Sequence, residues 1–402
     1  MSVQTDYDVI VVGGGPSGAT AAHDLTMQGH KVMLLDKAGR IKPCGGAVPP
    51  RLLKDFDIPQ SLLVAHANSA RIIAPSNNKV SMPCGDGYVG MVDRDQFDEW
   101  LRTRAADAGA TRVTGTCETV QDGEGGVATL TYRTDRSAEP VTVTARCVIG
   151  ADGARSRVAR QCIPNGENVK CVFAYHEIVK VPEGAAAQQA ADYEPDRCDV
   201  YYQGHLSPDF YAWVFPHGKT ASIGLGSANK GFPLRETTRI MRQEAGFADW
   251  ETVRKEGAPI PLKPLKRWDN GRNVLVAGDA AGVVAPSSGE GIYYAMCAGR
   301  LSANAVGEFL VTGNPKALKG ARKAFMKAHG RVFWILGIMQ YFWYSSDKRR
   351  ESFVKMCADP DVQRLTWEAY MNKELVKRDP MAHIRIFLKD TAHLLGLRPA
   401  KA

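Results

Sequence analysis

The chain begins with an alternation of apolar and helical segments that is typical of a parallel β-α-β unit. Residues 7–13 form a short, almost wholly apolar and β-branched run, which predicts a buried parallel strand. A helical pattern covers residues 19–28 and stops at Gly29, a residue suited to end a helix. Residues 31–35 form a second apolar strand, which ends at Asp36. We therefore predict an α/β fold with a Rossmann-like domain at the start of the chain.

A glycine-rich turn joins the first strand to the helix. Gly13, Gly15 and Gly18 occupy the three glycine positions of G-x-G-x-x-G. The first allows the tight turn, the second lets the backbone approach a pyrophosphate, and the third lets the helix pack on the strand. The helix N-terminus presents free N–H groups to the phosphates. Asp36, 23 residues after Gly13, is placed to accept hydrogen bonds from a ribose. The unit therefore predicts a dinucleotide site.

The middle of the chain changes to the two-residue alternation of antiparallel strands. We predict strands over residues 199–203, 210–216 and 220–226, separated by turn residues. Residues 71–92 have the pattern of short strands, and we assign them to the same lid-like sheet. Residues 185–191 are of low complexity and predict a loop or a short helix.

These patterns predict three parts, of which the first two are discontinuous in sequence. The dinucleotide-binding domain comprises residues 1–70, 93–165 and 269–312. An antiparallel β-sheet domain for the substrate comprises residues 71–92 and 166–268. Residues 313–402 form a basic, helical C-terminal region.

Composition narrows the class of protein. Among 402 residues, 44% are hydrophobic and 23% charged, which excludes a disordered or fibrous chain. The nine cysteines are scattered without metal-ligand spacing, so we expect neither a metal site nor a disulfide scaffold. The polar start lacks a signal-peptide pattern, and no stretch reaches the roughly 18 apolar residues that a membrane span needs. We therefore expect an intracellular protein that does not cross a membrane.

The basic excess lies entirely in the last quarter of the chain. Residues 311–402 hold 18 Lys and Arg against 8 Asp and Glu, whereas the rest holds 33 against 35. Residues 332–344 within this region are apolar or aromatic apart from Gln340, with cationic residues on both sides. This pattern suits a helix at the surface of an anionic membrane, and a buried core helix with solvated flanks is the alternative. We disfavour nucleic-acid binding because the basic residues flank an apolar helix and no nucleic-acid motif is present.

Two later segments extend the dinucleotide motif. Asp152-Gly153 follow an apolar strand, and Gly278-Asp279 end another, ahead of a helix that begins near Gly289-Glu290-Gly291. With the glycine loop, they resemble the signature of glutathione-reductase-type flavoproteins in the hydroxylase-like branch. The resemblance implies that FAD is the cofactor and that Asp279 contacts its ribityl chain. It also implies that the helix N-terminus stabilises the negative charge of the reduced flavin.

The same resemblance assigns Arg94, in the segment VDRDQFDEWL, to an FAD contact and places Cys44 near the flavin ring. The expected cofactor-binding residues are Gly13, Gly15, Pro16, Ser17, Gly18, Asp36, Lys37, Cys44, Gly45, Arg94, Asp152, Gly153, Gly278, Asp279, Gly289, Gly291 and Ile292.

Aromatic residues alternate along residues 210–216, so Tyr211, Trp213 and Phe215 share one face of a strand. An aromatic ladder in a sheet core would give the same pattern. The string PDFYAWVFPHG, however, resembles the Y-x-W-x-F-P-x-G motif of the geranylgeranyl reductase family. The segments GGGPSGATAA, RIKPCGGAVPP, VDRDQFD and GDAAGVVAPSSGEGI agree with that family in order and spacing, over about residues 5–345. Many members carry lysine where this chain has His217, which leaves the role of that position open.

The resemblance implies an FAD-dependent oxidoreductase that saturates C=C bonds of a geranylgeranyl chain, with NADPH as electron donor. It is closest to the branch that acts on chlorophylls and bacteriochlorophylls, so the expected partner is such a prenylated pigment or geranylgeranyl diphosphate. Tyr211, Trp213 and Phe215 are the expected substrate-binding residues. The implied location is cytoplasmic, at the periphery of the inner or photosynthetic membrane.

An isolated alkene lacks a carbonyl that could accept negative charge, so we expect protonation before hydride transfer. Trp213 and Tyr211 would stabilise the resulting positive charge. The candidate proton donors are Cys44, Tyr211, His217 and water. Two other functions stay open: an FAD-dependent monooxygenase or halogenase of the same fold, and a non-catalytic flavin-containing protein that binds or assembles pigment.

Overall fold

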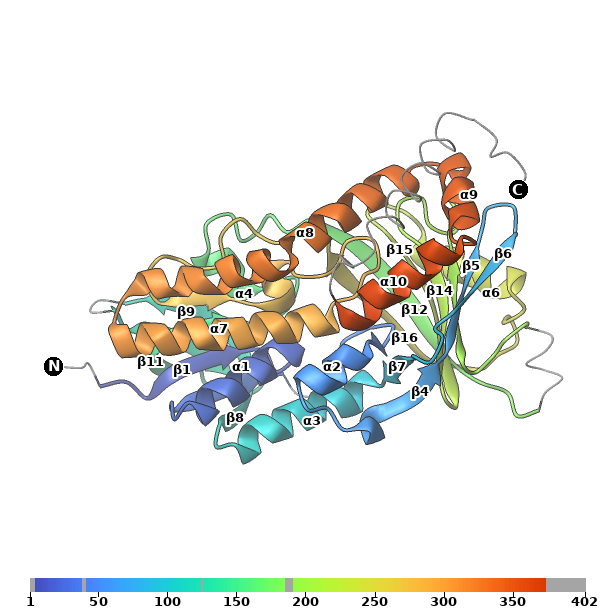
Figure 1. Cartoon of the computed structure of the whole chain (residues 1–402). Helices are drawn as coiled ribbons and strands as arrows, with labels where there is room; N and C mark the ends of the chain where they lie inside the picture. Colours follow the sequence, from blue (N-terminus) through green and yellow to red (C-terminus); the bar gives the residue numbers. More distant parts are fainter. Residues whose placement is uncertain (1–3, 38–40, 124–125, 185–190, 374–402) are drawn as a thin grey trace. The chain divides into compact units, whose positions relative to one another are not determined.

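The computed structural model describes residues 4–37, 41–123, 126–184 and 191–373 (Figure 1). Its internal contacts divide the chain into two compact units, each assembled from three segments. The first unit comprises Met1–Cys44, Arg94–Val172 and Pro259–Gly337, and the second comprises Gly45–Asp93, Phe173–Ala258 and Ile338–Ala402.

The sheet of the first unit is parallel at its centre. Its strands lie in the order β8 (Thr111–Thr114), β2 (Val32–Asp36), β1 (Tyr7–Val12), β11 (Val141–Gly150), β10 (Ala128–Arg133) and β9 (Thr116–Asp122). Strand β17 (Val274–Val276) also pairs with β11, in parallel. The predicted β-α-β unit is confirmed, because β1 and β2 pair in parallel with Val9 opposite Val32. The apolar run of β1 is buried, as a central parallel strand requires.

Helices pack against this sheet. The first unit contains α1 (Pro16–Met27), α3 (Arg94–Asp107), α4 (Arg157–Cys162), η3 (Gly278–Ala281), α7 (Ile292–Thr312), η4 (Pro315–Leu318) and the larger part of α8 (Lys319–Trp343). Helix α1 packs on α7 and on α3, and α1 and α7 lie side by side in Figure 1. This packing fixes the first helical turn that follows the glycine loop.

The second unit is built on a mainly antiparallel sheet. Its strands lie in the order β16 (Thr252–Pro261), β12 (Cys171–Lys180), β15 (Thr220–Ser227), β14 (Ala212–His217), β13 (Arg197–Tyr201), β5 (Ser69–Ile73) and β6 (Lys79–Pro83). A small sheet of β3 (Ala47–Val48), β7 (Val89–Val92) and β4 (Leu63–Ala67) belongs to the same unit. The strands predicted over 199–203, 210–216 and 220–226 are thus present as β13, β14 and β15, with small shifts at their ends.

One face of the larger sheet is covered by α6 (Leu234–Glu244). Val214 and Ile223 point to this side and form a buried core with Met241 of the helix and Phe247 after it. The unit also contains α2 (Pro50–Asp55), η1 (Gln60–Leu62), α9 (Asp347–Met356) and α10 (Pro360–Asn372). Because side chains alternate along a strand, the neighbours of Val214 on β14 face the opposite side of the sheet.

The contacts place the boundaries of the parts differently from the sequence prediction. Residues 45–70 pack with the second unit, because β4 pairs with β7 and β5 pairs with β13. The C-terminal region, expected to be separate, is shared. Arg322 donates a hydrogen bond to the Leu265 carbonyl of the first unit, whereas α9 packs on β6 of the second. Of the predicted segment 185–191, residues 185–190 lie outside the described residues.

Candidate active site

The glycine loop forms a cradle at the start of α1. Gly13 has a φ of +105°, and a Cβ there would lie 2.4 Å from the Ala151 carbonyl oxygen. A Cβ at Gly18 would lie 1.8 Å from the Gly13 carbonyl oxygen, so glycine is required at both positions. Gly15 differs, because a Cβ there would meet open space. The loop is therefore closed toward the protein and open where a ligand would lie.

This cradle fits the pyrophosphate of a dinucleotide. Helix α1 begins at Pro16 after Gly15, and no side chain caps its N-terminus. The Ser17 hydroxyl is buried and has no hydrogen-bond partner within the described chain. A phosphate oxygen would satisfy both the uncapped N–H groups and this hydroxyl. Pro16 and Ser17 thus lie in the first turn of this cradle, and their contact with a cofactor stays a prediction.

Asp36 lies at the end of β2, next to the glycine loop. A Cβ at Gly14 would lie 2.9 Å from Asp36 Cγ. Arg102 Nη1 is 3.3 Å from Asp36 Oδ2 and 3.3 Å from the Gly14 carbonyl oxygen, so it joins the two. Lys37 follows β2 and is exposed. Sequence reasoning missed Arg102, although it lies two helical turns after the predicted Arg94 on the same side of α3.

The side chain of Arg94 is fixed by a residue one turn later on the same helix, α3. Its guanidinium donates two hydrogen bonds to Asp98, at 2.8 and 2.7 Å, and both side chains are buried. Burial alone would lower the pKa of Arg94, but the Asp98 carboxylate and a hydrogen bond with Cys44 raise it. The predicted residues Arg94 and Cys44 are therefore neighbours, and Arg94 is the charged group that faces the Cys44 sulfur.

Gly278-Asp279 contact the same helix start. Gly278 has a φ of +62°, and a Cβ there would lie 2.7 Å from Ser17 Cβ. The buried Asp279 carboxylate forms an ion pair with Lys42. Lys42 was not predicted, because an ion pair across 237 positions leaves no local sequence signal. The first unit thus brings the glycine loop, Asp279 and the segment before Cys44 together.

Asp152 has a structural function. Its carboxylate accepts hydrogen bonds from the Ser156 hydroxyl and from the Arg157 backbone N–H, and Ser156 is the residue that caps α4. Burial raises the pKa of Asp152 in spite of these bonds. Gly153, with a φ of +85°, borders open space. The expected contact of Asp152 and Gly153 with FAD stays a prediction.

The second predicted helix start is also present. Helix α7 begins at Ile292 after Gly291, with no side-chain cap. A tight turn precedes it, in which Gly289 N–H donates to the Ala285 carbonyl at 2.9 Å. The uncapped N-terminus of a 21-residue helix can face an anionic ring edge, as the resemblance implied.

In the second unit, β14 carries the aromatic motif. Trp213 and Phe215 have ring centroids 6.1 Å apart, and Tyr211, just before the strand, is 5.9 Å from Trp213. They share the sheet face opposite α6, as predicted. The row continues through Tyr202, 6.1 Å from Tyr211, to Tyr344, 5.1 Å from Tyr202. Tyr202 and Tyr344 extend the predicted motif into a longer aromatic wall.

Two glycines pack directly on this wall. A Cβ at Gly45 would lie 3.0 Å from Phe215 Cδ2, and a Cβ at Gly46 would lie 2.5 Å from His217 Nε2. The residue that follows Cys44 in the chain therefore touches the aromatic motif. Close backbone approach explains why glycine is used at both positions.

His217 is buried at the end of β14. Its Nδ1 is 3.2 Å from the Phe215 carbonyl oxygen. Burial lowers the pKa of His217 to about 4. The imidazole is therefore neutral near pH 7, which argues against the charged form of His217 as the proton donor.

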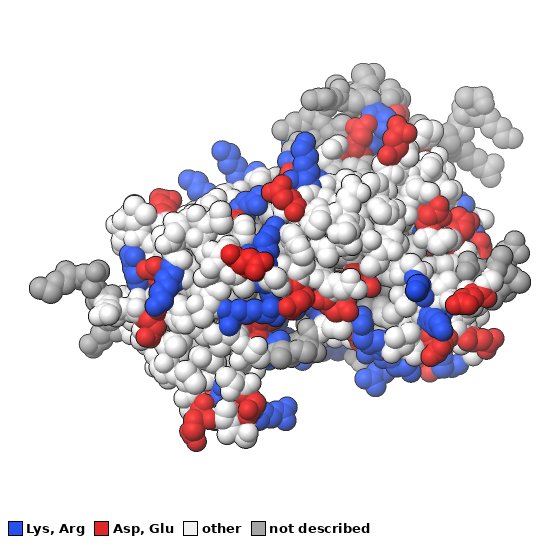
Figure 2. All heavy atoms as spheres, turned by 90° about the horizontal axis from the view of Figure 1, so that it is seen from below, with Lys and Arg blue, Asp and Glu red and all other residues white. Residues whose placement is uncertain are grey.

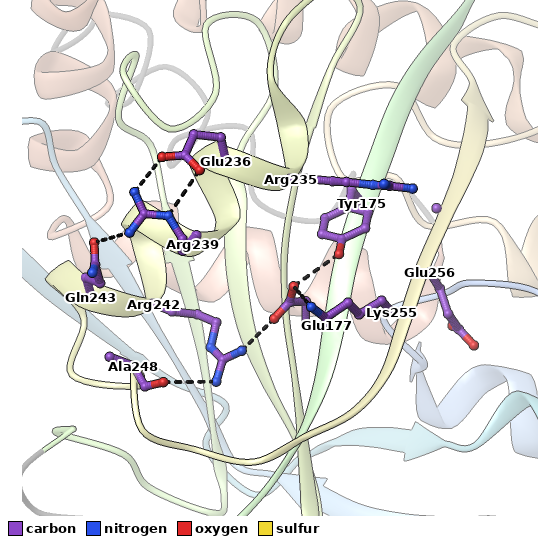
Figure 3. Close-up of a pocket in the computed structure, with 11 residues that line it drawn as sticks. Tyr175, Glu177, Arg235, Glu236, Arg239, Arg242, Gln243, Ala248, Lys255 and Glu256 are labelled. Carbon is purple, nitrogen blue, oxygen red and sulfur yellow. Dashed lines mark hydrogen bonds and ion pairs between the residues drawn. The ribbon is translucent and has the colours of Figure 1, made fainter.

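A cavity of about 700 Å³ lies on the other face of the sheet, beside α6 (Figure 3). Glu177 accepts hydrogen bonds from the Tyr175 hydroxyl at 3.0 Å and from Arg242, so its charge is paired. The side chain of Glu256 points away from this group in Figure 3. Tyr175 and Glu177 alternate with His176 along β12, so this cavity and the Trp213 side chain lie on opposite faces of the sheet.

Among the described residues, no group of His, Cys, Asp or Glu side chains could hold a metal ion. No helix within that part of the chain is both long and apolar enough to cross a membrane.

Comparison with known proteins identifies the family. Residues 6–180 match the family described as FAD binding domain. Geranylgeranyl diphosphate reductase from Rhodobacter capsulatus is 54% identical to this chain over 98% of both proteins. The protein of the same name from Synechocystis is 34% identical, over 96% of this chain and 97% of its own.

Two solved structures share the fold. A geranylgeranyl bacteriochlorophyll reductase-like protein from Thermoplasma acidophilum has a TM-score of 0.77 at 23% identity, and covers 94% of this chain and 99% of its own. A flavin-dependent brominase has a TM-score of 0.74 at 14% identity, over 97% and 99%. At these identities the likeness shows the fold alone. The sequence match along almost the whole length of the Rhodobacter protein is decisive, and the chain belongs to the geranylgeranyl diphosphate reductase family of FAD-dependent oxidoreductases.

Proposed function

We propose that this protein saturates C=C bonds of a geranylgeranyl chain to give the phytyl chain, with NADPH as the electron source. The substrate is geranylgeranyl diphosphate or a geranylgeranyl-(bacterio)chlorophyll. The names of the relatives support the chemistry, and the aromatic wall supports the substrate class. The run of rings from Phe215, which is half-buried, to the buried Tyr344 would offer an apolar surface to a polyprenyl chain.

The chemistry requires a proton and a hydride for each double bond. Reduced FAD, when bound, would supply the hydride. A protein group or water protonates the less substituted alkene carbon, which leaves positive charge on the tertiary carbon until the second C–H bond forms there. The π faces of Trp213 and Tyr211 stabilise that charge by about 1–2 kcal/mol each in a site without water. Gly45 and Gly46 keep the backbone close to this wall and so help to exclude water.

The cofactor-binding groups follow from the first unit. The Ser17 hydroxyl and the N-terminus of α1 would hold the pyrophosphate, and Asp36 the ribose. Asp279 and the N-terminus of α7 would hold the ribityl chain and the ring edge. Of the proton donors, Cys44, Tyr211 and water remain after the low pKa of His217 is considered. Cys44 is the donor we favour, because it hydrogen-bonds with Arg94 and directly precedes Gly45.

A second part of the proposal is peripheral contact with an anionic membrane through α8. Trp334, Ile338 and Tyr341 lie on one side of this helix and are 67%, 48% and 85% exposed. Arg331, one turn before Trp334, is also exposed. After the helix, the Arg349 guanidinium lies 4.3 Å from the Phe342 ring centroid. Exposed aromatics between cations are what an interfacial helix presents to anionic headgroups, and a prenylated substrate is itself held in such a membrane.

Anaerobic turnover tests the proposed reaction. The FAD-loaded protein is incubated with NADPH and, in separate arms, with geranylgeranyl diphosphate or geranylgeranyl-bacteriochlorophyll, and products are weighed by mass spectrometry. We expect successive gains of two hydrogens in at least one arm. A product that contains added oxygen or halogen and forms only with O2 would favour a monooxygenase or halogenase. A bound pigment of unchanged mass would favour a non-catalytic role.

Substitution of Trp213 tests the role of the aromatic wall. We expect Trp213→Ala to slow single-turnover alkene reduction by about tenfold or more, because the charge stabilisation is lost. A variant that binds substrate weakly but reduces it at the wild-type rate would contradict the cation mechanism. Phe247→Leu, on the α6 side of the sheet, controls for a general loss of packing.

A further inference from the structure

A chain of four polar side chains crosses the sheet of the second unit, with one residue from each of four neighbouring strands. Trp213 Nε1 donates to Ser222 Oγ at 3.1 Å, and Ser222 Oγ is 2.8 Å from His176 Nδ1. His176 Nε2 is 3.0 Å from Glu256 Oε2. The residues belong to β14, β15, β12 and β16, which are adjacent in that order. The chain ends at the indole of the aromatic motif.

The sheet leaves room for this chain at one glycine. Gly224 is paired with His176 on one side and with Trp213 on the other. A Cβ at Gly224 would lie 2.5 Å from both His176 Cβ and Trp213 Cζ2. Ser222 is wholly buried, and His176 and Trp213 are nearly so. Buried polar groups in this setting are stable only when each is hydrogen-bonded, so the chain behaves as one unit.

Which groups donate and which accept along this row of hydrogen bonds follows from Glu256, its last member. Burial alone would raise the pKa of Glu256, but hydrogen bonding to His176 and the charge of Arg254 lower it, so the group is a carboxylate and can only accept. His176 Nε2 therefore donates to Glu256, and we assign Nδ1 as the acceptor that faces Ser222. Ser222 then donates its hydroxyl to His176 and accepts the Trp213 N–H. We assign this tautomer from the hydrogen-bond network.

We propose that Ser222, His176 and Glu256 are positioning residues that act on the reaction through Trp213. The hydrogen bond to Ser222 fixes the plane of the indole within the wall. It also draws the N–H proton away from the ring, which increases the electron density on the π face where positive charge develops. The carboxylate of Glu256 strengthens each bond of the chain, because linked hydrogen bonds polarise one another in a buried site. The catalytic part of this inference rests on the proposed function.

The hydrogen bond itself is tested by NMR on the FAD-loaded full chain with 15N-labelled tryptophan. The sequence has seven tryptophans, and the signal lost in Trp213→Phe identifies the relevant indole N–H. We expect Ser222→Ala to shift this signal upfield and to speed its hydrogen exchange at least tenfold. Glu256→Gln should shift it part of the way, and Ser222→Thr, which keeps a hydroxyl, should restore it.

The control is Ser227→Ala, which makes the same change at a buried serine on the same strand. Ser227 Oγ donates to Asp209 at 2.7 Å and is not part of the chain to Trp213. We expect this variant to leave the Trp213 signal and the reduction rate unchanged. The same proteins are then compared in single-turnover alkene reduction. We expect Ser222→Ala to lower the rate about tenfold with less than a threefold change in KM.

The outcomes separate the two claims. An unchanged Trp213 signal in Ser222→Ala would contradict the proposed hydrogen bond between Trp213 and Ser222. A shifted signal with a wild-type reduction rate would overturn its role in catalysis. If the wild-type protein reduces no geranylgeranyl substrate, the proposed function fails, and the NMR result still decides whether the chain exists.

Discussion

His217 shows how burial sets the charge of a side chain next to the aromatic wall. Among the described residues, the hydrogen-bond partner of His217 Nδ1 is the Phe215 carbonyl oxygen, which carries no full charge to balance a proton on the ring. Desolvation is therefore the largest influence and lowers the pKa of His217 to about 4. A lysine at this position would bring a charge that this buried site does not balance. The structure thus supports a neutral packing role beside Gly46.

The low pKa of His217 predicts a specific loss of stability in acid. Its ordinary pKa of 6.5 applies to the unfolded chain, so between about pH 6.5 and 4 the unfolded state binds a proton that the folded state does not. Stability is therefore lost as the pH falls through this window, by about 2 kcal/mol between pH 7 and 5. Urea unfolding of the wild type and His217→Gln at both pH values measures this effect. The variant should lose about 2 kcal/mol less.

The control for this prediction is His66→Gln, which removes an exposed histidine from the same unit. It should leave the difference between pH 7 and pH 5 close to that of the wild type. An equal acid sensitivity in the wild type and His217→Gln would contradict the assignment.

Single residues were predictable from the sequence where the signal was local. The glycine loop and Asp36, and likewise Tyr211, Trp213 and Phe215, are related by short fixed spacings. In the structure Asp36 lies beside Gly14, and the three rings share one face of the sheet. Lys42, Ser222 and His176 were not predicted. Their partners lie on other strands or turns, 9 to 237 positions away, and become neighbours only when these elements pair. Local spacing carries no information about such contacts.

At the scale of elements, α1 and α7 meet so closely that their contact controls the cofactor cradle. A Cβ at Gly299 of α7 would lie 2.2 Å from the Ser17 carbonyl oxygen. The backbone of α1 cannot yield locally at that point, because Gly18 is already in contact with Gly13. Any side chain at Gly299 must therefore move the first turn of α1, which carries the hydroxyl proposed to bind phosphate.

Gly299→Ala should destabilise the protein and weaken FAD binding. The matched control is Gly307→Ala, two turns later on α7, where a Cβ would clash with the end of the exposed Gln28 side chain and make an ordinary contact with His30 Nε2 at 3.8 Å. Both changes gain about 1 kcal/mol of helix propensity, so their difference isolates the backbone clash. We expect Gly299→Ala to be less stable than Gly307→Ala by about 1–3 kcal/mol in urea unfolding. Flavin fluorescence should show greater FAD release from Gly299→Ala, and equal release from both variants would contradict the proposed cradle.

The order of elements was largely predictable, whereas their grouping was not. The spacing of hydrophobic residues along the sequence identified the β-α-β unit and the strands around Trp213, because both patterns are local. Residues 45–70 were predicted with the dinucleotide-binding segments, whereas their contacts lie in the second compact unit, since β4 pairs with β7 and β5 with β13. Short strands such as β4 and β5 would have similar hydrophobic patterns in the first unit and in the second.

At the scale of the whole molecule, charge is distributed unevenly along the chain. Residues 1–310 carry nearly equal numbers of acidic and basic side chains. On the face drawn in Figure 2, Lys and Arg side chains lie interspersed with Asp and Glu. The excess of cations belongs to the region that contains α8. An attraction to anionic lipid is therefore expected to act through this region, where the exposed aromatic residues of α8 also lie.

Vesicle binding tests this expectation. The purified holoprotein is mixed with vesicles of phosphatidylglycerol and phosphatidylcholine and sedimented. We expect Trp334→Ser combined with Tyr341→Ser to lower the bound fraction at least fivefold, because each exposed ring buries apolar area at the interface. Val311→Ser, which removes an 82% exposed apolar side chain from α7, should have no effect.

Binding should fall with added salt and disappear on vesicles of phosphatidylcholine alone, since cations next to the rings contribute. Because the changed residues lie outside the aromatic wall, reduction of a detergent-dispersed substrate should continue at the wild-type rate. If the double variant and Val311→Ser bind alike, α8 is not the membrane contact.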